Sequence, residues 1–81
     1  MPRITRARMA AEADYLANTA APRADAAAAD GEQFAANPAN SDSTRQCAAT
    51  AAKIARRTAA DYRSMAATLR AGEIPDGFSF N

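Results

Sequence analysis

The sequence predicts an all-α fold of two or three helices, organised around one long C-terminal amphipathic helix over about residues 44–71. Alanine, the strongest helix former, occupies 25 of the 81 positions, and β-branched residues are few. Residues 51–70, AAKIARRTAADYRSMAATLR, separate apolar from basic side chains when they are placed on a helix. A chain of this length supports one domain, residues 1–81, which we expect to be a small helical bundle.

The N-terminal part predicts a first helix over about residues 3–20. Pro2 suits the first turn of a helix, and Pro22 argues against uninterrupted continuation past residue 20. Met9, Ala13 and Leu16 share one face of this helix, which we expect to pack antiparallel to the long helix.

A second helix is predicted over residues 23–36, where four consecutive alanines favour it. Gly31 weakens this helix by about 1 kcal/mol. Phe34 is the only large apolar residue between Leu16 and Cys47, so the helix must approach its neighbour through alanines. The sequence leaves open whether this segment is ordered without a binding partner.

The composition of residues 37–43 predicts a loop, and the long helix follows it. Ser43 and Gln46 have the spacing of a capping box, in which two side chains satisfy free amides at a helix start. Gly72 stands where a C-terminal glycine is expected, and Arg70 suits the last turn. A helix of these 28 residues would be about 42 Å long.

The long helix has two contrasting faces on a helical wheel. The predicted apolar face comprises Cys47, Ala51, Ile54, Thr58, Tyr62, Met65 and Leu69. The predicted basic face comprises Arg45, Lys53, Arg56, Arg57, Arg63 and Arg70. One short partner helix cannot cover the apolar face, so we expect Cys47, Ile54, Tyr62, Met65 and Leu69 to form a core and a homodimer interface.

The basic face has three interpretations. The first is a solvated face, which every amphipathic helix needs. The second is binding of DNA or RNA phosphates, which would be sensitive to salt. The third is attraction of an acidic protein surface. No helix-turn-helix motif and no interleaved aromatic residues accompany the basic side chains, so base recognition and single-strand stacking lack support.

The residues available for chemistry are few. Histidine is absent and Cys47 is the only cysteine, so we expect no metal site, no disulfide within the chain and no cofactor. We expect Cys47 to be buried as a small apolar residue. No glycine-rich phosphate loop and no paired carboxylates on an apolar face occur, so we expect no enzyme activity. A single free cysteine, no leader and no long apolar run favour a cytoplasmic protein without a membrane segment.

The tail, residues 72–81, contains a Pro-Asp-Gly turn and three large apolar residues, Ile74, Phe78 and Phe80. These side chains either cover the end of the bundle or anchor a partner. With segregated charge and no catalytic groups, they favour a protein-binding module, a small regulator or inhibitor such as phages and other mobile elements encode. The alternative is a nucleic-acid-binding accessory protein that uses the basic face.

Overall fold

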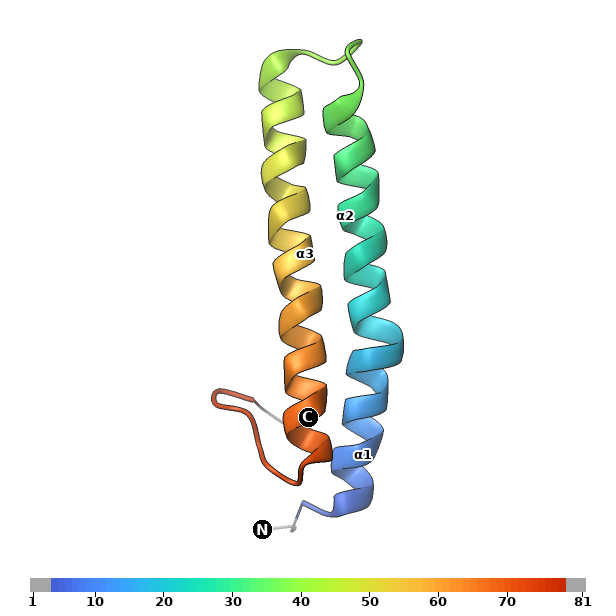
Figure 1. The fold of residues 1–81 in the computed structure, drawn as a ribbon, viewed down its shortest axis with the longest axis vertical. Coiled ribbons are helices and arrows are strands. Elements are labelled where there is room, and N and C mark those ends of the chain that lie inside the picture. The colour runs from blue at the N-terminus through green and yellow to red at the C-terminus, as the bar shows by residue number, and fades with distance from the viewer. Residues whose placement is uncertain (1–3, 79–81) are drawn as a thin grey trace.

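The protein is a hairpin of two long antiparallel helices, as the computed structural model shows for residues 4–78 (Figure 1). The first helix consists of α1 (Arg6–Tyr15), a π-helical turn η1 (Leu16–Ala20) and α2 (Ala21–Ala36). The second helix is α3 (Asp42–Arg70). The molecule measures 54 × 20 × 18 Å. The all-α prediction is confirmed, since the part of the chain between residues 4 and 78 contains helices and no strand.

The first helix continues through Pro22, so the predicted break after residue 20 is wrong. A proline inside an α-helix lacks its own N–H and pushes against the carbonyl four residues earlier. Here the widened turn η1 ends two residues before Pro22, and the Ala21 N–H donates to the Leu16 carbonyl in a π-type bond. The wider turn accommodates the proline ring, and the segments predicted as separate helices, about 3–20 and 23–36, form one helix.

The loop between the two helices is short and is held by local hydrogen bonds. The Asn37 side chain accepts from the Ala39 N–H at 3.0 Å, and the Asn40 amide donates to the Phe34 carbonyl at 3.0 Å. Ser41 caps the start of α3, because its hydroxyl accepts from the Thr44 N–H at 3.2 Å. The predicted capping box at Ser43 is therefore misplaced by two residues.

The C-terminal end of α3 has the predicted glycine. Gly72 has a φ of 84°, which glycine adopts without steric cost. Its N–H donates to the Leu69 carbonyl, and the Glu73 N–H donates to the Thr68 carbonyl, at 3.0 and 3.1 Å. This pair of bonds is a Schellman motif, which satisfies carbonyls left free at the helix end. The predicted Pro-Asp-Gly turn is also confirmed, with the Phe78 N–H donating to the Pro75 carbonyl at 3.0 Å.

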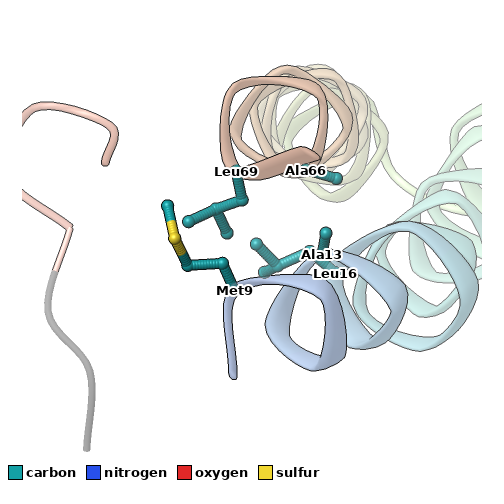
Figure 2. Packing of buried hydrophobic residues seen from close by; sticks show 5 residues of the cluster. All are labelled: Met9, Ala13, Leu16, Ala66 and Leu69. Atoms are coloured by element: carbon teal, nitrogen blue, oxygen red, sulfur yellow. The ribbon is translucent and has the colours of Figure 1, made fainter. Parts of the chain in front are cut away.

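The larger buried side chains gather at the end of the hairpin away from the loop, between α1 and the last turns of α3. Figure 2 shows Met9, Ala13 and Leu16 of the first helix facing Ala66 and Leu69 of α3. Partly buried side chains pack around this cluster: Ala17, Ala20, Tyr62, Met65 and Phe78. Fully burying a leucine or methionine contributes about 1.5–3 kcal/mol, so this end of the hairpin carries most of the hydrophobic stabilisation.

The half of the hairpin near the loop packs through alanines instead. Its buried residues are Ala21, Ala28, Ala52 and Ala59. Gly31 belongs to the same contact, because a Cβ atom there would lie 3.1 Å from the Ala48 carbonyl oxygen. Small side chains bring the two backbones together but remove little apolar area from water.

Within residues 4–78, no helix has the combination of length and apolar character that crossing a membrane requires.

Candidate functional site

The predicted apolar face of α3 is only partly used inside the chain. Leu69 is 2% exposed, and Tyr62 and Met65 are partly buried in the cluster. Cys47 is exposed and Ile54 is 62% exposed, so the predicted burial of these two residues within the chain is wrong. The use of the same residues as a homodimer interface remains a prediction.

The alanines of α3 explain this orientation. Ala52, Ala59 and Ala66 are buried at intervals of seven residues, which is the spacing of a close antiparallel helix pair. On the helix, Cys47 and Ile54 lie about 140–160° away from Ala52. Because alanines permit the closest approach to α2, the large apolar side chains of this half of α3 point away from it.

The exposed side of α3 presents an uncharged surface, which we call the outer face. It consists of Ser43, Cys47, Thr50, Ala51, Ile54 and Thr58. A shallow hollow in it is lined by Cys47, Thr50, Ala51 and Ile54, with Ser43 and Gln46 at one edge. Apart from the partly buried Thr58, all these outer-face residues are exposed. The outer face is therefore apolar or hydroxylic, accessible and free of charged side chains.

The arginines at positions 56, 63 and 70, which we call the arginine row, form ion pairs with the first helix. Arg56 donates to Glu32 at 2.7 Å and to Asp25 at 3.0 Å. Arg63 donates to the second carboxylate oxygen of Asp25. Arg70 reaches Asp14 in α1 at 3.1 Å. The row thus faces carboxylates of its own chain along most of the hairpin.

These contacts shift the pKa values of the groups involved. The hydrogen bond from Arg63, followed by that from Arg56, lowers the pKa of Asp25 below its usual value of 3.8. The hydrogen bond from Arg56 lowers the pKa of Glu32 below 4.5. The same two carboxylates, Glu32 first, raise the pKa of Arg56. The two arginines and two carboxylates of this group carry no net formal charge.

The other predicted basic residues, Arg45, Lys53 and Arg57, form no ion pair with a described carboxylate of the first helix. Arg45 donates its Nε–H to the Ala35 carbonyl at 2.7 Å, which satisfies a free carbonyl at the end of α2. It also lies 4.0 Å from Asp42. Lys53 and Arg57 form no ion pair with any residue from 4 to 78.

Between α2 and α3, a second hollow of about 500 Å³ lies near the loop. Its floor is alanine, from Ala35, Ala36, Ala49 and Ala52, and its rim carries Glu32, Lys53 and Arg56. Because Glu32 and Arg56 pair with each other across this hollow, the rim offers Lys53 as its one charged group without an ion-pair partner among the described residues.

The tail residues predicted to anchor a partner differ in their exposure to solvent. Ile74 is 50% exposed, whereas Phe78 packs against the hydrophobic cluster. Phe80 lies outside the described residues. The structure therefore places Phe78 in the role of covering the bundle end and leaves Ile74 accessible.

Three carboxylates pair with the arginine row. The sequence places Asp14 on the first helix, where it is expected to meet the basic side of the long helix, and its contact with Arg70 confirms this. The pairing of Asp25 and Glu32 with Arg56 and Arg63 was not predicted. A signal for this pairing was present. Asp25 and Glu32 are seven residues apart, as are Arg56 and Arg63, so an antiparallel pair of helices can match them. No group of three or more His, Cys, Asp or Glu residues in the 4–78 region is placed to hold a metal ion.

The chain matches no family model, and searches of curated proteins and of solved structures find no match either.

Proposed function

We propose that this protein is a non-enzymatic binding module, a small regulator or inhibitor that acts by occupying the surface of a partner protein. It contacts the partner through the outer face of α3. The observation that carries this proposal is the position of Ile54, which is 62% exposed within an uncharged surface. Burying such a side chain at an interface contributes about 1.5–3 kcal/mol.

The surroundings of Ile54 support a protein partner. The cores of protein interfaces are depleted in charge, and the outer face carries none over the four helical turns from Ser43 to Thr58. Neighbouring small side chains, Ala51 and Cys47, leave room for a partner side chain beside Ile54. Ile74 supplies a further exposed apolar contact in the tail that follows α3.

Nucleic acid is the second candidate. The observation that favours it is that Lys53 and Arg57, neighbours on α3, have no ion-pair partner among the described residues. Phosphate binding depends on cations that can replace the counterions of the nucleic acid. The arginine row is paired with carboxylates, so its contribution to such binding is small, and we rank the protein partner first.

Site-specific photo-crosslinking in the cells that make the protein tests the proposal. A photoreactive amino acid at position 54 should yield a discrete adduct with a different protein. The same amino acid in place of Gln33, an exposed residue of α2, serves as the matched control. The adduct's protein is then purified and titrated with the chain by calorimetry.

Ile54→Asp should abolish the calorimetric signal, while Gln33→Asp should leave it unchanged. Equal adducts from both positions, or binding that survives Ile54→Asp, would reject the outer face as the docking surface.

A further inference from the structure

We propose that the outer face of α3 also binds a second copy of this chain, in an antiparallel pair whose two-fold axis passes between Thr50 and Ala51. This inference rests on the proposed function in one respect, that the outer face is a docking surface, and it names a second copy as one of its partners. The spacing of the outer-face residues and two charged residues on one flank of α3, Arg57 and Asp42, support this pairing.

The outer face is complementary to itself in shape. In an antiparallel pair centred between residues 50 and 51, positions whose numbers add to 101 lie opposite each other. Cys47 then faces the partner subunit's Ile54, and Ser43 faces the partner subunit's Thr58. The small residues Thr50 and Ala51 lie at the axis, where they allow close approach of the helices. The large side chain thus falls opposite a small one, and it does so twice because the pair is symmetric.

The flanking charges are complementary in the same arrangement. With a two-fold axis normal to the plane of the two helices, the same flank of each copy lies beside its counterpart. Arg57 lies on the flank of α3 that also carries Asp42, and it has no ion-pair partner within residues 4–78. The Asp42 side chain is fully exposed, and its contact with Arg45 is long, at 4.0 Å. In this register Arg57 lies opposite position 44 of the partner subunit. The partner subunit's Asp42 is two residues from that position, which is about 3 Å along the helix axis.

The packing of the hairpin gives a reason for a second copy to bind here. The buried residues of the half near the loop are alanines, while Ile54 of the same half stays exposed. The face from Ser43 to Thr58 is about 22 Å long, which is short for an interface. Stable complexes bury about 800 Å² on each partner, so we expect a weak dimer that dissociates on dilution.

Disulfide formation tests the register directly. The variant Cys47→Ser with Ala51→Cys places its only cysteine within about 2 Å of the axis along the helix, and it should form a covalent dimer rapidly under mild oxidation. The unchanged chain is the first control. Its two Cys47 residues would be offset by about 10 Å along the helices, too far for a disulfide. The second control is Cys47→Ser with Ala60→Cys, on an exposed position outside the outer face.

A covalent dimer from position 51, and little from positions 47 and 60, is the expected result. Equal rates at all three positions would indicate random collisions and overturn the proposal. Faster crosslinking through Cys47 would indicate a parallel pair, which also overturns it.

Sedimentation of uncrosslinked protein over a wide concentration range provides the second arm. Arg57→Asp and Asp42→Arg should each weaken the dimer, and the double variant should restore it, because the ion pair re-forms with exchanged charges. A chain that stays monomeric at the highest concentration overturns the dimer and leaves the proposed function standing if Ile54→Asp still abolishes binding of the identified protein. A dimer that persists with Ile54→Asp shows that the copies associate elsewhere.

Discussion

Arg56 and Glu32 lie opposite each other across the hairpin, with 2.7 Å between Nη2 and Oε1, although 24 positions separate them in the sequence. Arg63 and Asp25 repeat this relationship one heptad further along each helix, and both pairs of numbers add to 88. The seven-residue spacing of the arginines is therefore matched by the spacing of carboxylates on α2. This match sets the register of the two helices where alanines and Gly31 make the contact.

Removing the carboxylate that two arginines share should loosen the hairpin. Asp25→Asn removes ion pairs to both Arg56 and Arg63, so we expect a small decrease in Tm, of a few degrees at most. Because the two arginines are exposed and Asp25 is partly exposed, the difference from the unchanged chain should be much smaller in about 1 M salt. Thermal melts followed by circular dichroism measure it, with Asp30→Asn, on a residue without an ion pair among the described residues, as the control. Equal effects of both variants would contradict a role for the pairs.

The stability of the hairpin should decrease in acid. The pKa values of Asp25 and Glu32 are lower in the folded chain than their usual values of 3.8 and 4.5. Their contribution is therefore complete above about pH 5 and is lost as the pH falls through those values toward the lower folded pKa values, because the unfolded chain binds protons first. Tm measured from neutral pH to about pH 2 should fall more for the unchanged chain than for Asp25→Asn with Glu32→Gln. Parallel curves would show that these carboxylates are not responsible.

Leu69 and Ile54 should respond differently to truncation, although both belong to the predicted apolar face. Leu69→Ala removes a side chain that is 2% exposed and should lower the free energy of unfolding by about 2–5 kcal/mol. Ile54→Ala should cost less than about 0.5 kcal/mol in dilute solution, since the side chain is mostly exposed. Urea unfolding at low protein concentration measures both. Similar losses would mean that Ile54 is buried in the monomer.

The alanine contact should reject larger side chains. Ala59 is fully buried between the helices, so Ala59→Leu should destabilise the hairpin by about 1–3 kcal/mol. Ala60→Leu adds the same atoms at an exposed position and should have little effect on stability. A comparison of the two urea midpoints tests the prediction. An Ala59→Leu variant as stable as the unchanged chain would show that the helices lie further apart.

The sequence predicted those parts of the fold that depend on local chemistry. The long helix, its end at Gly72 and the tail turn follow from propensity, capping and glycine at positive φ, and each lies within a residue or two of its predicted place. The break at Pro22 was predicted wrongly because a local π-turn absorbs the proline, and no propensity scale reports that accommodation.

The orientation of α3 depended on tertiary contacts and could not be found from side-chain size. A helical wheel weighted by large apolar residues pointed Cys47 and Ile54 inward, whereas the hairpin closes through Ala52 and Ala59. The predicted and observed inward directions of α3 differ by roughly 140°. Because the alanines face α2, the arginine row beside them lies close enough to reach the carboxylates of α2.

Binding of labelled random-sequence duplex DNA, measured by fluorescence anisotropy at low and at physiological salt, tests most directly whether the arginine row serves the hairpin instead of an external ligand. We predict no binding at physiological salt and at most a weak signal at low salt, from Lys53 and Arg57. Micromolar binding that weakens steeply with salt and is lost in Arg63→Glu would contradict this account, and would make nucleic acid the ligand of the basic face.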